Sequence, residues 1–457
     1  MAGILDVIFH LYQKLPRLQR LTPSQVLVIG FAGLILLGAI LLSLPIASRD
    51  GQPLRFINAL FTATSAVCVT GLVVVDTHDQ FSLFGQLVII LLIQAGGLGI
   101  MVVSTLIALI LGRRIGLRGR ILIQEAMNQF TLEGMIRLIK QVIAVTAIVE
   151  GTGALLLAFR FIPQMGFVKG LYYGAFHAVS GFCNAGFDLF GGFRSLTGYR
   201  DDVLVNLVMT SLIIIGGIGF AVITDVRQYF TTKHLSLNSR IVLAVTAMLI
   251  LIGTATILLL EWDNPRTMGG LPLGSKVLSS YFQAVTPRTA GFNTLPIGDM
   301  RSATLFFTII LMFIGASPGS TGGGIKTATF GVLVIAVWSV VRGREDPEAF
   351  GRRIPHRAVY RALAVAMISL TLVVVVTMLL SITEKTAFVR VLFEATSAFG
   401  TVGLSTGITP GLTMAGRIAI ILTMFAGRVG PLTIATAIAQ RLCINGVKFP
   451  EERVMVG

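Results

Sequence analysis

Four short segments of this chain have the residue types that could bind a dehydrated cation through backbone carbonyl oxygens. Each contains the phrase Phe-x-Ala-(Thr or Val)-(Ser or Thr), and a glycine follows five or six residues after the phrase ends. The phrases begin at Phe61, Phe176, Phe282 and Phe393, and the glycines are Gly71, Gly186, Gly291 and Gly403. Glycine allows a tight turn with no side chain to block a neighbouring turn, so carbonyls can replace an ion's hydration shell. The recurrence predicts four backbone turns around one cation pore.

The candidate ion-binding residues are those at each glycine and just before it: Val69, Thr70, Gly71, Asn184, Ala185, Gly186, Thr289, Ala290, Gly291, Thr401, Val402 and Gly403. A partly apolar segment that is too short to cross a bilayer precedes each turn, at residues 53–66, 170–181, 275–286 and 386–398. Such a segment can enter the membrane as a half-helix if the chain that follows it faces a cavity or other protein. Its negative dipole end would favour a cation at the turn.

The composition is that of a polytopic membrane protein. Of 457 residues 54% are hydrophobic and only 12% are charged, and the mean hydropathy is +0.86. Soluble cores cannot hold so much apolar surface. The three cysteines, Cys68, Cys183 and Cys443, are too few for a disulfide framework, and we expect buried thiols. The five histidines are scattered and form no cluster with cysteine or aspartate, so we expect neither an enzyme nor an organic cofactor.

Eight apolar runs are long enough to cross a bilayer, at residues 25–47, 83–111, 136–160, 203–224, 240–260, 302–340, 358–382 and 414–440. Two runs flank each phrase. The expected fold is therefore all-α, with eight transmembrane helices in four helix–pore loop–helix repeats. The repeats would cover residues 25–111, 112–224, 225–340 and 341–440, between an N-terminal segment at 1–24 and a C-terminal segment at 441–457.

Positive charge gathers where these repeats join. Lys and Arg number six in residues 113–140, three in 227–240 and six in 342–361. The positive-inside rule makes these junctions cytoplasmic, so both termini would lie inside and the four turns would open outward from a cytoplasmic membrane. The net charge of +15 is then explained by topology and lipid contact, without nucleic acid.

A second recurrence lies within the second run of each repeat. Gly96-Gly97-Leu98-Gly99 and Gly216-Gly217-Ile218-Gly219 fit close helix packing. The third copy expands over residues 315–327, where five glycines and a proline within ten positions predict an unwound loop beneath the turns. No strand precedes it and Ile325 interrupts the Gly-Lys-Ser/Thr rule, which disfavours nucleotide binding.

The fourth copy places Arg428 in mid-membrane, where a cation is normally paired. One interpretation is a gate in which Arg428 holds the loop by its carbonyls; the other is a structural pair with Glu150. The predicted gate consists of Gly315, Ala316, Ser317, Pro318, Gly319, Ser320, Thr321, Gly322, Gly323, Gly324 and Arg428.

Together these motifs resemble the Trk/Ktr/HKT superfamily of potassium transporters, in particular the membrane subunits of bacterial Ktr systems. The phrases with their glycines, the stretch 286–292, the loop 315–327 and the stretch 426–431 carry the resemblance, which extends over essentially the whole chain. It implies a pseudo-fourfold pore in each protomer of a homodimer, and potassium uptake that sodium often stimulates. It also implies a cytosolic ring of nucleotide-binding regulatory subunits. Serine in place of the first glycine favours sodium in the family, whereas this chain has Gly71.

An alternating-access cation carrier, a sodium/potassium symporter, is the alternative function, because broken helices also mark carriers. Carriers of that kind are often built from inverted repeats. Two crossings per repeat would make the repeats here parallel, which favours a channel-like core.

Overall fold

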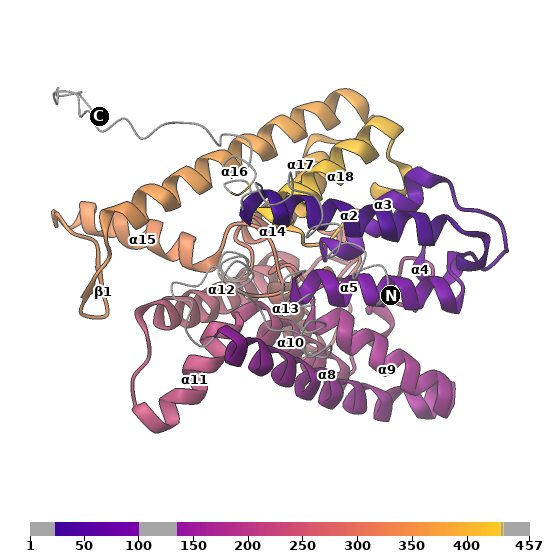
Figure 1. Cartoon of the computed structure of the whole chain (residues 1–457), viewed down its shortest axis with the longest axis horizontal. Helices are drawn as coiled ribbons and strands as arrows, with labels where there is room; N and C mark the ends of the chain where they lie inside the picture. Colours follow the sequence, from indigo (N-terminus) through magenta and orange to yellow (C-terminus); the bar gives the residue numbers. More distant parts are fainter. Residues whose placement is uncertain (1–22, 100–134, 431–432, 434–457) are drawn as a thin grey trace, which may run out of the picture.

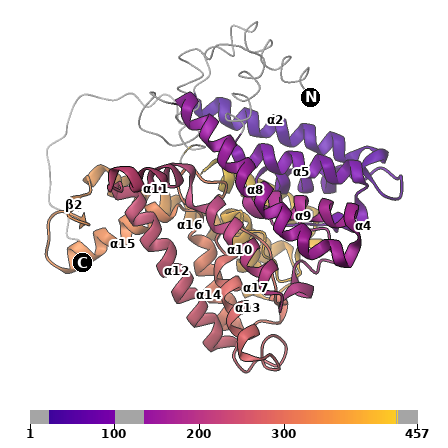
Figure 2. The same cartoon turned by 90° about the horizontal axis from the view of Figure 1, so that it is seen from below.

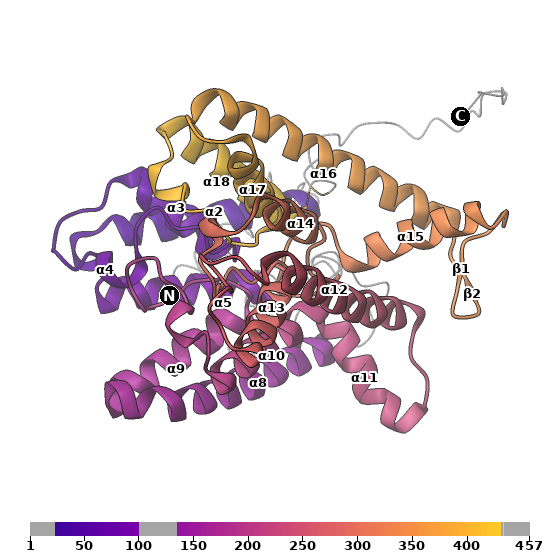
Figure 3. The same ribbon diagram turned by 180° about the vertical axis from the view of Figure 1, so that it is seen from behind.

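The computed structural model describes residues 23–99, 135–430 and 433 of the chain. This part is predominantly helical. Successive portions of the sequence lie around a common centre, so that the indigo N-terminal helices and the yellow C-terminal helices are neighbours (Figure 1). A two-residue pairing of β1 (Glu348–Ala349) with β2 (Arg352–Arg353) makes a small antiparallel hairpin. The hairpin lies at the far end of α15 and away from the body (Figures 1 and 3).

Four helices are long and apolar enough to cross a membrane: α2 (Pro23–Ser43), α8 (Met135–Met165), α12 (Leu237–Glu261) and α16 (His356–Thr383). Each begins one of the predicted repeats. Their outer faces expose large apolar side chains, such as Leu155 and Ile382. Apolar side chains on the outside of long helices are stable in lipid and costly in water, so these helices fit a membrane protein.

A shorter helix packs against each of these four. The shorter helices are α3 (Phe56–Val67), α9 (Phe167–Phe182), α13 (Leu273–Val285) and α17 (Phe388–Gly400), and they overlap the four segments predicted as half-helices. Figure 2 shows α8 and α9 side by side, and Figure 3 shows α13 and α17 near the middle of the molecule. The phenylalanine that opens each phrase is fully buried, which anchors the helix end in the core.

The second helices of the repeats end or break within the spans predicted for them. They are α5 (Leu83–Leu98), α10 (Val203–Ile218) with α11 (Phe220–Thr232), α14 (Ser302–Phe313) with α15 (Thr327–Val341), and α18 (Met414–Val429). The unwound segment predicted in the third repeat is confirmed, between Phe313 and Thr327. The prediction of one continuous span at 203–224 was wrong, because α10 and α11 are bent by 96°.

The last glycine of the second recurrence explains where three of these helices end. Gly99, Gly219 and Gly430 have φ values of +85°, +97° and +93°, and each directly follows the end of a helix. Glycine adopts this conformation without the steric cost that a Cβ imposes. The recurrence therefore ends helices as well as packing them. The continuations predicted up to residues 111 and 440 lie outside the described residues, except for Thr433.

Close packing, predicted for the first two copies, is confirmed in them and extends to the fourth. A Cβ on Gly96, Gly216 or Gly427 would lie 2.0, 1.9 or 1.9 Å from a carbonyl oxygen at the end of the same repeat's half-helix. In these three repeats the second helix therefore packs closely against the end of its own half-helix. Cys68 and Cys183 are buried free thiols, as predicted, whereas Cys443 lies outside the described residues.

Short helices and turns connect these elements. They are α4 (Thr77–Gln80) and the 3-10 turns η2 (Pro45–Ala47), η3 (Thr197–Tyr199), η4 (Ile297–Asp299) and η5 (Thr409–Gly411). Residues 1–22 of the predicted N-terminal segment, the segment 441–457 and most of the junction at 113–140 lie outside the described residues, whereas residues 23 and 24 belong to α2.

Candidate functional site

The four recurring glycines meet in a closed ring. A Cβ added to Gly71 would lie 2.5 Å from the carbonyl oxygen of Ala185, and one added to Gly186 would lie 3.0 Å from that of Ala290. The order continues from Gly291 to Val402 at 2.7 Å and closes from Gly403 back to Thr70 at 2.0 Å. Each glycine thus faces the carbonyl that precedes the next glycine in chain order. No other residue type fits at these four positions without moving the neighbouring backbone.

All four turns have the same unusual backbone conformation. The glycines have φ values of +91°, +70°, +78° and +90° in chain order. Two residues earlier in each turn a residue other than glycine also has positive φ: Val69 at +56°, Asn184 at +59°, Thr289 at +68° and Thr401 at +49°. A residue with a Cβ adopts this conformation at a cost of roughly 1–2 kcal/mol. Repetition of that cost at four equivalent places points to a functional requirement for the turn.

The hydroxyl at the end of each phrase holds the turn that follows it. In the first and fourth repeats Ser65 and Ser397 accept hydrogen bonds from the N–H groups of Gly71 and Gly403, at 3.0 and 3.1 Å. In the other two repeats the hydroxyl donates to the carbonyl oxygen after the glycine, from Ser180 to Phe187 at 2.7 Å and from Thr286 to Phe292 at 2.5 Å. Sequence reasoning missed this role. The signal was present, because the last position of all four phrases is Ser or Thr.

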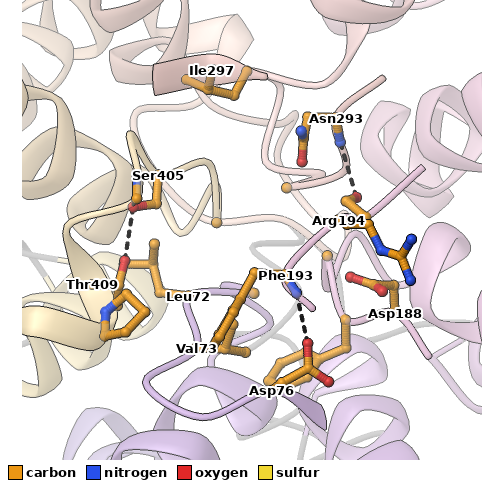
Figure 4. Close-up of a pocket in the computed structure, with 18 of the residues that line it drawn as sticks. Leu72, Val73, Asp76, Asp188, Phe193, Arg194, Asn293, Ile297, Ser405 and Thr409 are labelled. Atoms are coloured by element: carbon orange, nitrogen blue, oxygen red, sulfur yellow. Dashed lines mark hydrogen bonds between the residues drawn. The ribbon is translucent and has the colours of Figure 1, made fainter. Parts of the chain in front are cut away.

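A cavity of about 420 Å³ opens onto the ring and is lined by all four glycines. Figure 4 shows side chains from several repeats around it, among them Asp76, Asp188 and Arg194. Burial raises the pKa of the Asp188 carboxyl to about 7; the hydrogen bond from the N–H of Phe190 opposes this rise and the carboxylate of Asp76 adds to it. Two carboxylates and one guanidinium, those of Asp76, Asp188 and Arg194, thus line this cavity above the ring, which we call the vestibule.

The irregular loop between α14 and α15, residues 314–326, lies against the ring. The N–H of Gly323 donates to the Thr401 hydroxyl at 3.1 Å. A Cβ on Gly322 would lie 2.0 Å from the hydroxyl oxygen of Thr289. These contacts place the loop next to the third and fourth turns, and the glycines are required there because the loop and the turns are too close for side chains.

Other repeats hold much of this loop. The N–H groups of Ser317 and Thr321 donate to the carbonyls of Gly217 and Gly216, at 2.9 and 3.3 Å. In return the N–H of Phe220, the first residue of α11, donates to Gly319 at 3.0 Å. Within its own repeat the loop is pinned by a parallel bridge between Ile314 and Ile325. The break between α10 and α11 leaves backbone groups on both sides of it without a partner in their own helix, and these are the groups that bond the loop.

Arg428 joins the loop to the first repeat. Its guanidinium donates to the carbonyl of Thr321 in the loop and to those of Gly96 and Gly97 at the end of α5. Glu150 accepts instead from the Gln94 amide at 3.2 Å and from the Cys183 thiol at 3.8 Å. Of the two partners predicted for Arg428, the guanidinium bonds the loop, whereas Glu150 has other partners. Carbonyls satisfy the guanidinium donors at the end of a membrane helix, where a free cation would be costly.

The sequence matches a known protein family over most of its length. Residues 19–443 match the family described as TrkH, cation transport protein. The chain belongs to the TrkH family. This confirms the membership that the motifs indicated. Within this family the chain is 48% identical to the Ktr system potassium uptake protein B of Bacillus subtilis, over 96% of this chain and 97% of that protein. It is 42% identical to the potassium/sodium uptake protein NtpJ of Enterococcus hirae, over 96% and 98%.

The fold of the TrkH family is also recognisable. The structure of the potassium transporter TrkH from Vibrio parahaemolyticus superposes with a TM-score of 0.67, covering 89% of this chain and 84% of that one. Sequence identity is 20%, so this likeness concerns the fold alone. Among the described residues no group of three or more His, Cys, Asp or Glu could hold a metal ion. The ring of backbone turns, in which each glycine faces a carbonyl oxygen of another repeat, is the candidate cation site of this TrkH-family chain.

Proposed function

We propose that this chain takes up potassium across the bacterial cytoplasmic membrane through a channel-like pore. The closed ring of Gly71, Gly186, Gly291 and Gly403 carries the proposal, because a ring of backbone carbonyls can replace the hydration shell of a monovalent cation. Half-helix dipoles and the vestibule carboxylates would favour cations over anions. Potassium as the ion is supported by the names of the relatives in Bacillus subtilis and Enterococcus hirae.

The loop 314–326 is proposed as the gate of this pore. It lies against the ring on the side of Thr289 and Thr401, and Arg428 fastens it by the carbonyl of Thr321. Conduction would require the loop to move aside. Because several of its hydrogen bonds end on other repeats, a small relative shift of the repeats would release it.

Topology and assembly complete the proposal. Eight spans, with both termini cytoplasmic, would form four repeats around one pseudo-fourfold axis, and two such chains would form a homodimer. Sodium stimulation is supported by the name of the Enterococcus hirae relative. Control by a cytosolic nucleotide-binding ring is proposed through the basic junction at 342–361, where Arg352 and Arg353 are exposed on β2.

The filter is tested by potassium uptake in a host that lacks its own potassium transport. Gly291→Ser adds a side chain at a position where even a Cβ would lie 2.7 Å from the carbonyl of Val402. Potassium affinity and the preference for potassium over sodium should both fall. Gly274→Ser is the matched control, because a Cβ there meets nothing within 4 Å. Unchanged preference in serine variants of all four ring glycines would remove the ring from the ion pathway.

The docking surface is tested by co-purification with the regulatory subunit. Replacing Arg352 and Arg353 with Gln should weaken the complex in moderate salt and leave ion selectivity unchanged, because the hairpin is remote from the ring. Complex formation at the wild-type level would move the contact to another cytoplasmic segment. Lys385→Gln, an exposed charge beyond the other end of α16, is the control.

Current recording separates a pore from a carrier. A channel-like core should give unitary current steps in planar bilayers. Saturable flux at carrier turnover with no unitary current would instead support a sodium/potassium symporter.

A further inference from the structure

The second position of the recurring phrase is polar in every repeat. The four residues are Thr62, His177, Gln283 and Glu394. Their exposed fractions are 0, 0, 2 and 0%, although each lies on a helix within an apolar core. A buried polar side chain is costly unless it is hydrogen-bonded, so the partners of these side chains indicate what they are for.

In the fourth repeat the partner is the segment that follows the ring glycine. Glu394 on α17 accepts a hydrogen bond from the Ser405 hydroxyl at 2.9 Å and another from the Thr409 hydroxyl. Ser405 comes two residues after Gly403, and Thr409 is the first residue of η5. The two hydroxyls also contact each other at 2.9 Å at the cavity wall (Figure 4). One carboxylate thus fastens the outer part of the fourth turn to its own half-helix.

The second and third repeats make the same connection with other chemistry. Nε2 of His177 accepts from the N–H of Leu189 at 3.3 Å, while its Nδ1 bonds the carbonyl of Tyr173 at 2.7 Å. In its satisfied orientation, the Gln283 carboxamide oxygen accepts from the N–H groups of Thr294 and Leu295, both at 3.2 Å. All three acceptors reach the chain two to six residues after the ring glycine.

The first repeat lacks this connection. The buried hydroxyl of Thr62 has no hydrogen-bond partner in the described part of the chain. The chain after Gly71 is fastened further on, where the Asp76 carboxylate accepts from the N–H groups of His78 at 2.9 Å and of Phe193 at 2.8 Å. Phe193 belongs to the second repeat. Beyond Gly71, therefore, the first repeat has a hydrogen bond to a neighbouring repeat but none from the second position of its own phrase, whereas each of the other three repeats has such a bond.

We propose that His177, Gln283 and Glu394 are positioning residues for ion discrimination, and that the first turn of the ring is the one left free to adjust. The inference rests on the proposed function of the ring as a filter. The phrase's terminal hydroxyl fixes each turn near its glycine, and the acceptor at the second position fixes the chain beyond it. A turn held at both places keeps its carbonyls at one distance from the axis, which is what discrimination between two ions of different radius requires.

Substitution of the acceptor in the fourth repeat is the decisive experiment. Glu394→Leu removes the carboxylate that accepts from the buried Thr409 hydroxyl and from the half-buried Ser405 hydroxyl at the cavity wall, and we expect the apparent KM for potassium to rise by about tenfold, with the maximal rate changed much less. The preference for potassium over sodium should fall with it. Glu394→Gln should restore most of both, because its amide still provides an acceptor and hydroxyls can reverse their bonding. Thr62→Val, at the equivalent place in the first repeat, should change neither.

A second route protects the test against misfolding of the half-helix. Ser405→Ala with Thr409→Val removes the two donors and leaves α17 unchanged, and should reproduce the effect of Glu394→Leu. Membrane content and elution volume in detergent are measured for every variant. Equal KM and selectivity in Glu394→Leu, in the double variant and in Thr62→Val would overturn the proposal. So would an effect of Thr62→Val as large as that of Glu394→Leu.

The Gly291→Ser variant separates failure of this inference from failure of the filter. If Gly291→Ser loses selectivity while Glu394→Leu keeps it, the ring is the filter and the second-position acceptors do not position it. If neither variant loses selectivity, the proposed filter itself is wrong.

Discussion

The ring of turns and the gate loop are both irregular backbone at the centre of the molecule, but different atoms hold them. Each turn of the ring has a hydrogen bond with the hydroxyl that ends its own repeat's phrase, as when Ser397 accepts the N–H of Gly403. The gate loop bonds backbone groups of the second repeat and the Arg428 guanidinium of the fourth. An element held from within its own repeat keeps its shape when repeats shift, and an element held from several repeats does not. Under the proposed function, this difference supports selectivity in the ring and gating in the loop.

Among the predicted effects, we expect the largest, on maximal potassium flux, from removal of Arg428. Arg428→Ala takes away the donors that bind the loop carbonyl of Thr321, and the loop should open more often. We expect the maximal potassium flux to rise by about tenfold, since ~1.4 kcal/mol of lost loop stabilisation is a factor of ten in an open–closed equilibrium. The apparent affinity and the preference for potassium should change little, because the ring is intact. Initial uptake rates over a range of potassium concentrations measure both.

A partial deletion within residues 315–324 should act in the same direction and should abolish dependence on the regulatory subunit. Arg390→Ala, which removes an exposed arginine, is the control for Arg428→Ala. A deletion variant that is folded and inserted, but whose flux is unchanged or reduced, would make the loop structural and contradict the comparison.

Loss of a hydroxyl at the end of the recurring phrase should lower the ion preference and leave the maximal flux nearly unchanged, which is the opposite of the result expected for Arg428→Ala. Ser397→Ala leaves the buried N–H of Gly403 without its acceptor, at a cost of about 1–3 kcal/mol to the turn. The preference for potassium over sodium should fall by about fivefold with little gain in maximal flux. Ser279→Ala is the control, because this buried hydroxyl on α13 has no partner in the described residues. Equal selectivity in the two variants would mean that the hydroxyl does not hold the turn.

The smallest effect is expected at the vestibule. Because the pKa of Asp188 is raised to about 7, its carboxyl becomes neutral as the pH falls through that value and ionised as the pH rises. Potassium affinity should therefore decrease by about twofold to fivefold between about pH 8 and about pH 6, as the negative potential above the ring is lost. Asp188→Asn should remove this pH dependence, and Asp201→Asn, an exposed carboxylate, should preserve it. A wild-type pH profile in Asp188→Asn would assign the dependence to another group.

The sequence alone predicted the local parts of the site. A residue that has positive φ and packs against a neighbouring carbonyl has to be glycine. The sequence shows four such glycines, each five or six residues after the recurring phrase. The glycines and proline of residues 315–324 predicted the unwound loop for the same reason, because backbone preference depends on the residue and its near neighbours. The apolar runs at residues 25–47, 136–160, 240–260 and 358–382 predicted the four long helices, since each run is long enough to cross a bilayer by itself.

Tertiary structure decided which of these parts meet. Hydropathy gave residues 203–224 as one span, yet the helix breaks at Gly219, and the backbone groups on either side of the break bond the loop 314–326 of another repeat. The choice between the loop and Glu150 as the partner of Arg428 depended on positions more than one hundred residues away in sequence. The same is true of the order in which the four glycines close the ring. Such contacts carry no local signal, because they depend on how the repeats pack and not on what any one segment prefers.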